Sequence, residues 1–492
     1  MEIILLSLII PLLALIFESY PRFLNREFGV DIWTHLLYLK EYHKQKGIPR
    51  KIEDGFLVSG TYDYPPAFIF ILSKFPFRLV EKYEFLFSPF FDAIHLILIY
   101  IIAYYLTGSI IIALLTQLFY TLTPIIILEN SSATPRSMGY TLFTIVLISL
   151  FLFNINGSYI YLLSAVISGS LIFLSHRFTA QGFLFFSIFL TILQRNFIYS
   201  FVFIVCFIFA LILSKGFYIK VLKGHMGNLI FWYKNINFRF AHQVKGNYEE
   251  YKTKDFIFRL YNQFLKFPPF IFAITNPWTL PSIFIILLGL SATPITKFML
   301  AWVIFSYILA LLTTWIPKLR FLGEGQRYLE LSAFPAAFLS SLLLISLLKT
   351  NYGSLAVILY SFISLASLIT IIVIQRKGII KEKLRTLTPG MKSMFKYLKN
   401  MKNKPDLLCI PHQITTNTIY HTDCRVFVNA DYAGINKISE VYPYFTKPIP
   451  EVMKKYRLDM ILLNSDYAKI VDLKLRKYVI IKNIDNFFLI KI

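Results

Sequence analysis

Charged residues and cysteines are both scarce in this chain of 492 residues. Only 16% of the residues are charged and 56% are hydrophobic, whereas soluble domains carry about 25% charged residues. Together with a mean hydropathy of +0.61, this composition excludes a soluble globule, and it equally excludes a disordered or collagen-like chain. The sequence therefore predicts an integral membrane protein.

The three cysteines are too few for a disulfide framework, and no Cys-x-x-Cys motif occurs. Cys409 and Cys424 would pair only if their segment faces an oxidising compartment. The sequence also lacks a Walker loop, a dinucleotide fingerprint, a zincin helix and a nucleophile elbow. His412 and His421 supply too few ligands for a metal site by themselves. The chemistry must therefore be sought outside these common motifs.

The charge that is present has a strong excess of one sign. Lys and Arg number 50 against 27 Asp and Glu, which gives a net charge of +23. In a membrane protein this excess indicates affinity for anionic lipid headgroups or phosphorylated substrates, so we expect membrane lipids as partners and no nucleic acid. The N-terminus lacks the basic region of a signal peptide, and we expect the first apolar run to be a retained membrane helix.

Long apolar runs predict an α-helical, polytopic protein with about eleven spans, because a membrane helix needs roughly 20 mostly apolar residues. The expected spans are 2–17, 88–107, 109–128, 138–154, 158–175, 179–195, 196–214, 269–290, 294–314, 331–349 and 353–374. The apolar piece 66–77 is too short to cross and is interrupted by Lys74 and Pro76. We expect it to form an interfacial helix in the first outer loop.

The polar segments are distributed unevenly between these spans. With a cytoplasmic N-terminus, the long segment 18–87 and the C-terminal segment both face outside. The basic segment 215–268 would be drawn to the cytoplasm by the positive-inside rule, which long segments obey poorly. We therefore expect a multi-pass protein of the cell membrane with its C-terminal domain on the outer face.

The composition changes after residue 374. Residues 375–492 hold 22 Lys and Arg against 10 Asp and Glu, and short β-rich runs alternate there with helical stretches. We expect strands at 407–410, 425–428, 460–463, 478–481 and 487–490, with helices at 391–401 and 450–456. The sequence thus predicts a transmembrane domain over 1–374, with its first outer loop at 18–87, and a small soluble α/β domain over 375–492.

The first outer loop contains the most informative residues. Apolar residues recur at helical spacing between 32 and 42, which predicts an amphipathic helix lying along the membrane. Asp31 stands at its start, where the exposed N–H groups and the helix dipole favour a carboxylate. A helix cap would therefore explain Asp31, and so would a chemical role.

A second carboxylate closes the same loop. Asp63 and Tyr64 precede two consecutive prolines, which fix an extended entry into the following helix. An Asp before a Pro-rich turn is common in proteins, so a structural role is again available. Two carboxylates in one loop at a membrane surface are nevertheless a candidate acid/base or metal pair.

These features together resemble the GT-C superfamily of multi-spanning glycosyltransferases, which take sugars from polyprenyl-phosphate donors. The resemblance is carried by the short first helix, the large first outer loop that opens with Asp before an amphipathic helix, and the closing Tyr-x-Tyr-Pro-Pro. It covers the order of parts along the whole chain. It implies an inverting transfer of a hexose or pentose to a glycan, lipid or protein acceptor on the outer face.

The resemblance also implies roles for individual residues. The acidic residue that opens the first outer loop of the family is the presumed catalytic base or metal ligand, and that position is Asp31 here. The family often has two acidic residues at this point, whereas this chain has Asp31 followed by Ile32. A two-carboxylate site would have to recruit Asp63. A divalent metal such as Mg²⁺ or Mn²⁺ at Asp31 is left open.

Positive charge would be needed to hold the departing phosphate. The family places an Arg in a late outer loop before its last group of spans, and Arg327 is similar to it. Arg136 with Glu129 in the second outer loop, and the turn His176-Arg177, are further candidates for substrate binding. Each of these basic residues also has a plain alternative role as a helix-end side chain that reaches the headgroups.

Two other classes of function stay open. A transporter or flippase for a lipid-linked or anionic solute would use ionisable groups inside its spans, and Asp92 with His95 is the best such feature. A non-catalytic membrane scaffold would instead tolerate the loss of Asp31 or Arg327.

Overall fold

The computed structural model describes residues 2–29, 31–239, 241–246, 268–286, 289, 293–383 and 385–492. It divides into two compact units. The helical unit comprises Met1–Leu24, Tyr83–Tyr218 and Asp255–Lys381, and the sheet unit comprises Asn25–Lys82, Ile219–Lys254 and Glu382–Ile492. The first loop therefore groups with the C-terminal segment.

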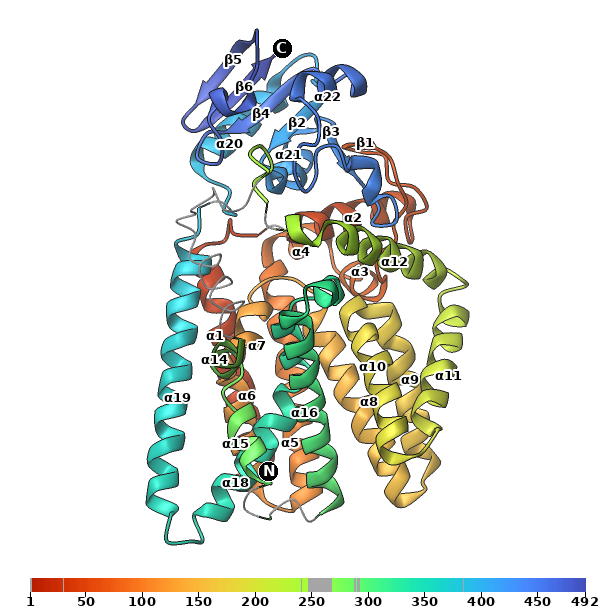
Figure 1. Cartoon of the computed structure of the whole chain (residues 1–492), viewed down its shortest axis with the longest axis vertical. Helices are drawn as coiled ribbons and strands as arrows, with labels where there is room; N and C mark the ends of the chain where they lie inside the picture. The colour runs from red at the N-terminus through yellow and green to blue at the C-terminus, as the bar shows by residue number, and fades with distance from the viewer. Residues whose placement is uncertain are drawn as a thin grey trace. The chain divides into compact units, whose positions relative to one another are not determined.

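The helical unit is made of mostly apolar helices (Figure 1). They are α1 (Glu2–Leu24), α5 (Phe87–Thr107), α6 (Ile110–Thr121), α7 (Pro124–Asn130), α8 (Arg136–Asn156), α9 (Tyr159–Ser175), α10 (Arg177–Gln194), α11 (Ile198–Leu213), α14 (Pro268–Thr275), α15 (Thr279–Phe284), α16 (Pro294–Trp315), α17 (Gly325–Glu330), α18 (Ala333–Leu347) and α19 (Gly353–Gln375). Gly108 and Gly157 end α5 and α8 with φ values of +65° and +67°, which glycine adopts without steric cost.

Within the described residues, six helices are long and apolar enough to cross a membrane, and up to eight spans result if each of two bent helix pairs counts as one. The bent pairs are α6 with α7, and α11 with the helix that begins at Tyr218. Tyr159–Ser175 and Ala333–Leu347 are shorter apolar helices. The described residues leave out the end of the expected span 269–290 and part of segment 215–268. The count of eleven spans stays a prediction.

The sheet unit contains one six-stranded sheet with the order β1-β3-β2-β4-β6-β5. The first four strands in this order pair in parallel, and β6 and β5 add in antiparallel fashion. The strands are β1 (Phe56–Val58), β2 (Leu407–Ile410), β3 (Val426–Asn429), β4 (Met460–Asn464), β5 (Val479–Ile484) and β6 (Phe487–Lys491). The five strands expected in the C-terminal segment are thus confirmed, whereas β1 comes from the first loop.

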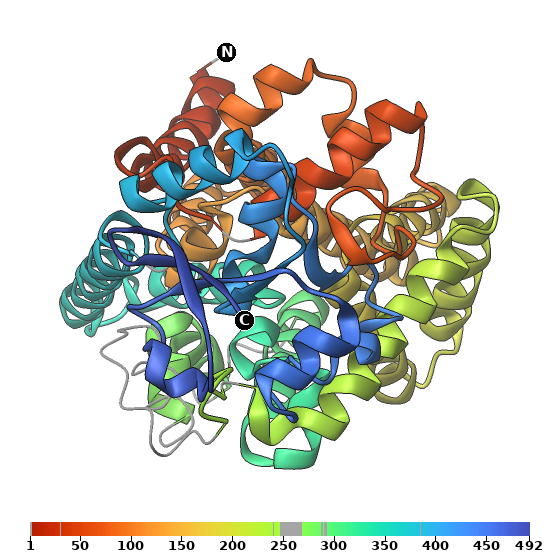
Figure 2. The same cartoon turned by 90° about the horizontal axis from the view of Figure 1, so that it is seen from above.

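The helices of the sheet unit are α2 (Asp31–Gln45), α3 (Ala67–Leu72), α4 (Phe77–Tyr83), α12 (Tyr218–Asn235), α20 (Pro389–Asn400), α21 (Thr415–Thr422) and α22 (Ile449–Tyr456). Helix α20 packs against the β5–β6 hairpin (Figure 1 and Figure 2). The core joins inward-facing residues of the strands to α22, including Leu408, Ile461 and Val452. Cys409 and Cys424 are free thiols in this unit.

Candidate functional site

Asp31 is the first residue of α2, as the sequence predicts, and its side chain is exposed. The helix forms because Ile32, Leu36 and Leu39 recur on one buried face. The carboxylate at the helix start is therefore accessible.

His35 lies one helical turn after Asp31 and is buried among aromatic rings. Its ring meets those of Tyr64 and Phe68 edge to face, with centroids 5.6 Å away in each case. Burial lowers the pKa of His35 to about 4, although the nearby Asp31 charge acts in the opposite direction. His35 is therefore neutral near pH 7, and among the described residues its Nδ1 has no hydrogen-bond partner.

Asp63 is buried and its Oδ2 accepts a hydrogen bond from the backbone N–H of Ala433, 2.8 Å away. Tyr64, which follows it, packs against Tyr432 with ring centroids 6.2 Å apart. Both residues thus tie the end of the first loop to the loop after β3. The catalytic role expected for Asp63 stays a prediction, and the observed contact is structural.

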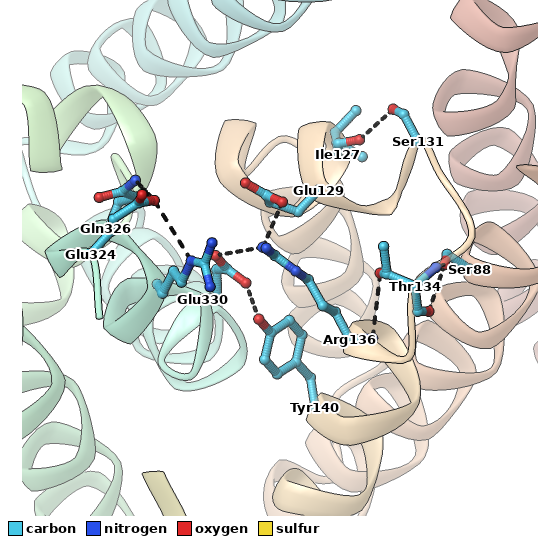
Figure 3. A network of polar contacts seen from close by, with 11 residues as sticks. Ser88, Ile127, Glu129, Ser131, Thr134, Arg136, Tyr140, Glu324, Gln326 and Glu330 are labelled. Atoms are coloured by element: carbon cyan, nitrogen blue, oxygen red, sulfur yellow. Dashed lines mark hydrogen bonds and ion pairs between the residues drawn. The ribbon is translucent and has the colours of Figure 1, made fainter. Parts of the chain in front are cut away.

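The predicted substrate-binding residues Glu129 and Arg136 meet in the helical unit. Arg136 Nη1 lies 2.5 Å from Glu129 Oε2 and 3.4 Å from Glu330 Oε1. The Tyr140 hydroxyl donates a hydrogen bond to the other carboxyl oxygen of Glu330. Figure 3 shows how these side chains of α7, α8 and α17 converge. Residues from three separate segments therefore form one polar cluster.

Glu330 is the buried member of this cluster. Its side chain has no exposed surface, against 13% for Arg136 and 35% for Glu129. Burial raises the pKa of Glu330 well above its ordinary value, and the Arg136 charge only partly opposes this. A glutamate with a raised pKa is protonated more readily. Glu330 can therefore contact the same Arg136 as Glu129 with less repulsion between the two carboxyl groups.

Arg327 lies in the same short helix as Glu330. Its Nε is 3.6 Å from Glu324 Oε2, and 32% of its side chain is exposed. Gln326 Nε2 also donates a hydrogen bond to Glu324 Oε2 over 2.8 Å (Figure 3). Arg327 is therefore the more accessible of the two arginines.

The position of α17 is set by close packing at its start and end. A Cβ at Gly325 would lie 2.1 Å from Thr314 Oγ1 and 2.5 Å from the backbone oxygen of Ala310, so only glycine fits there. Beyond its end, Trp302 Nε1 donates to the carbonyl of Leu331 over 2.9 Å. These contacts hold Arg327 and Glu330 in place.

His176 and Arg177 lie where α9 ends and α10 begins. His176 is buried, its Nδ1 is 2.8 Å from Thr179 Oγ1, and its ring lies 6.1 Å from that of Tyr140. The structure thus brings His176 next to the Arg136 cluster through Tyr140. Arg177 is partly buried at the same junction.

The sequence did not single out Glu330, Tyr140, Glu324 or His35. Glu330 pairs with residues 194 and 190 positions earlier in the chain, and no local pattern marks such a contact. His35 had a weak signal, since it stands four residues after Asp31 on a predicted helix.

The apolar helices and the C-terminal sheet form a fold that is shared by the Archaeoglobus fulgidus oligosaccharyltransferase and by ArnT. The resemblance drawn from the sequence is confirmed at the level of the fold. No protein-family model matches the sequence, and no curated protein matches it in sequence.

Solved structures of other proteins are similar to this chain in fold. The Archaeoglobus fulgidus oligosaccharyltransferase in its apo form is similar with a TM-score of 0.61 and 12% identity, over 93% of this chain and 69% of that one. ArnT from Cupriavidus metallidurans bound to undecaprenyl phosphate is similar with a TM-score of 0.57 and 10% identity, over 98% of this chain and 97% of that one. The first of these is an oligosaccharyltransferase, and the second binds undecaprenyl phosphate. At these identities the likeness establishes the fold alone.

The A. fulgidus enzyme has also been solved in complex with Zn and sulfate. Across the described ranges, no three His, Cys, Asp or Glu side chains come together as a metal-binding group. The nearest candidates differ in environment, since Asp31 is exposed whereas Asp63 is buried and bound to a backbone N–H. A divalent metal at Asp31 therefore stays a prediction.

Proposed function

We propose that this protein is a membrane glycosyltransferase that moves a sugar from a polyprenyl-phosphate donor to a glycan, lipid or protein acceptor on the outer face. The observation that carries the proposal is the likeness to ArnT with bound undecaprenyl phosphate, which spans nearly the full length of both chains. AglB from A. fulgidus, solved with a dolichol-phosphate and an inhibitory peptide, adds support for a lipid-linked donor.

In this proposal Asp31 is the general base. The acceptor hydroxyl attacks the anomeric carbon from the face opposite the phosphate, the bond from that carbon to the phosphate oxygen breaks, and Asp31 takes the hydroxyl proton. One base is enough, because no glycosyl-enzyme intermediate forms and the configuration inverts. The exposed position of Asp31 at the start of α2 supports this role. His35, one turn further along the helix, is neutral near pH 7 and so does not neutralise the negative charge of Asp31.

Arg327 holds the departing polyprenyl phosphate in this proposal. A guanidinium offers two parallel N–H donors that match phosphate oxygens. Arg327 is more exposed than Arg136 and lies 3.6 Å from its acidic neighbour, whereas Arg136 contacts Glu129 at 2.5 Å. We assign phosphate binding to Arg327, with Arg136, Glu129, His176, Arg177 and Tyr64 as further substrate-binding candidates.

The proposal is tested by sugar transfer in membranes that contain the wild-type protein or a variant. Radiolabelled polyprenyl-phosphate sugars serve as donors, with divalent metal present or chelated. Asp31→Asn preserves size and much of the capping ability while it removes the charge. Asp54→Asn is the matched control, since Asp54 is a carboxylate of the same loop that pairs with Lys44 at the surface.

We expect Asp31→Asn to lower transfer by at least about a hundredfold, the usual contribution of a general base, and Asp54→Asn to leave it unchanged. Arg327→Gln should lower transfer strongly, and Arg327→Lys should restore only part of it. Asp63→Asn separates the two roles of that residue, because the amide oxygen still accepts from Ala433. A folded Asp31→Asn protein that transfers normally would contradict the assignment.

A transporter is the second candidate, and one observation favours it. Inside the helical unit, Tyr120 donates to Asp92 over 2.8 Å, and His95 lies 3.0 Å from the same hydroxyl. Asn130 donates to Glu18, whose carboxyl is also bonded to Asp92. Buried ionisable groups in spans often mark ion or solute pathways. A flippase assay in vesicles with Asp92→Asn tests this candidate if the wild type transfers no sugar.

A further inference from the structure

A groove of about 390 Å³ opens on the sheet unit beside α20. Its volume falls within the range of small-molecule sites, about 300–1,000 Å³. The lining contains three lysines from one helix, together with an acid, an aromatic ring and a histidine from neighbouring elements. These residues are Lys392, Lys396, Lys399, Glu27, Phe395 and His421.

The three lysines stand on one face of α20, at positions i, i+4 and i+7. Like charges at this spacing destabilise a helix. Lys392 Nζ is 2.6 Å from Glu27 Oε1. Among the ion pairs of the described residues, Lys396 and Lys399 take part in none. Two adjacent ammonium groups are thus left for a ligand.

His421 forms a neutral wall of the groove. Its ring stacks on that of Phe395, with centroids 5.7 Å apart and planes at 17°, and meets the Trp33 ring edge to face at 4.7 Å. Burial lowers the pKa of His421, the charges of Glu27 and Glu81 oppose this shift, and those of Lys392 and Lys399 add to it. Within the described chain its Nε2 has no hydrogen-bond partner although it is shielded from water, and such groups are rare unless a ligand or water satisfies them.

The charges of the groove favour a dianion. Among the residues that line the groove, three lysines and one glutamate leave two uncompensated positive charges when His421 is neutral. Glu81, whose charge also reaches His421, is not part of the lining. A phosphate monoester carries about −1.5 to −2 charges near pH 7 and three acceptor oxygens. Carboxylates and phosphodiesters carry one charge and would leave one lysine unmatched.

We propose that the α20 groove is a binding site for a phosphate monoester, held by Lys396 and Lys399 and shared with Lys392. The monoester is either the headgroup of a lipid or a soluble phosphate. The site does not depend on the transferase proposal, because it is built from residues to which that proposal assigns no role.

The test uses the full-length protein. Native mass spectrometry in detergent compares retention of phosphatidic acid with retention of phosphatidylcholine, and calorimetry in phosphatidylcholine nanodiscs measures binding of glycerol 3-phosphate. The variant is Lys396→Gln/Lys399→Gln. The matched control, Lys402→Gln/Lys477→Gln, removes the same charge from exposed positions outside the groove. Lys396→Arg/Lys399→Arg restores the charge.

We expect the groove variant to weaken binding at least about tenfold in each arm where the wild type binds, since two charge-assisted hydrogen bonds are lost. The control should stay within about twofold, and the arginine variant should retain binding. Binding in the lipid arm alone identifies a lipid headgroup, and binding in the soluble arm alone identifies a free phosphate. The proposal is overturned if the wild type binds neither probe, or if the control loses as much as the groove variant.

Discussion

Glu330 is a buried carboxyl whose two oxygens both have partners, and this makes its substitution informative. Glu330→Gln keeps an oxygen acceptor for the Tyr140 hydroxyl, and Arg136 keeps Glu129. Glu330→Leu leaves the buried Tyr140 hydroxyl without this acceptor and removes one of the two carboxyl groups that Arg136 contacts. We expect Glu330→Leu to cost about 1–3 kcal/mol more than Glu330→Gln in free energy of unfolding. Thermal unfolding in detergent measures the difference, and equal melting temperatures would mean that the acceptor role is unimportant.

His35 predicts a dependence of stability on pH. Its pKa is about 4 in the folded protein and about 6.5 in an unfolded chain, so the unfolded state binds more protons between these values. Stability is therefore fully present above about pH 6.5 and is lost as the pH falls towards 4. We expect His35→Phe to make the free energy of unfolding less dependent on pH, by up to about 3 kcal/mol between pH 8 and pH 4.

The measurement is chemical unfolding at a series of pH values between 4 and 8. His43→Phe is the control, because His43 lies on the same helix but is exposed. Burial also lowers the pKa of His412 to about 4. The stability of the His35→Phe protein should therefore still fall somewhat as the pH is lowered. Parallel pH curves for His35→Phe and the wild type would contradict the prediction.

Single residues were predictable from sequence where the signal was local. Asp31 was expected at the start of a helix, and it is there. The contacts of Arg136 with Glu330 and of Asp63 with Ala433 were not expected, since both join segments far apart in the chain. Sequence patterns identify residue types suited to a site, and packing decides which of them meet.

Helix α17 depends on a glycine that admits no side chain. Gly325→Ala would place a methyl group against Thr314 and the backbone of Ala310. Backbone atoms cannot move aside as a flexible side chain can. We expect α17 to shift, with a loss of about 1–3 kcal/mol in stability and of Arg327-dependent transfer. Gly47→Ala, where nothing lies within 4 Å of the added Cβ, should change neither. Thermal unfolding and the transfer assay measure the two effects.

Strands and helices of ordinary length were largely predictable as elements. The run 460–463 was expected and Met460–Asn464 is observed, because a short, continuous run of apolar residues is typical of a buried strand. The three-residue strand β1 escaped notice, since Phe56–Val58 is too short for a periodic signal. The interfacial helix expected over 66–77 is instead two short helices, α3 and α4, with Pro76 between them.

Within the sheet unit, the pairing of β1 with β3 joins the first loop to the C-terminal segment. Val58 and Asn429 are partners in this parallel pair, so Val58→Cys/Asn429→Cys should form a disulfide on mild oxidation. Val58→Cys/Ile484→Cys should not, because β1 and β5 occupy opposite edges of the sheet. Peptide mapping under non-reducing conditions detects the link. Equal cross-linking of both pairs would contradict the strand order.

This strand pairing also has a consequence for biosynthesis. The backbone bond from Ala433 to Asp63 joins residues 370 positions apart, and β3 follows β1 by a similar distance. The ribosome therefore releases β1 long before its partner strand exists, and closing so long a loop is slow. The first loop of the nascent chain therefore keeps β1 unpaired until Asn429, the last residue of β3, has been made.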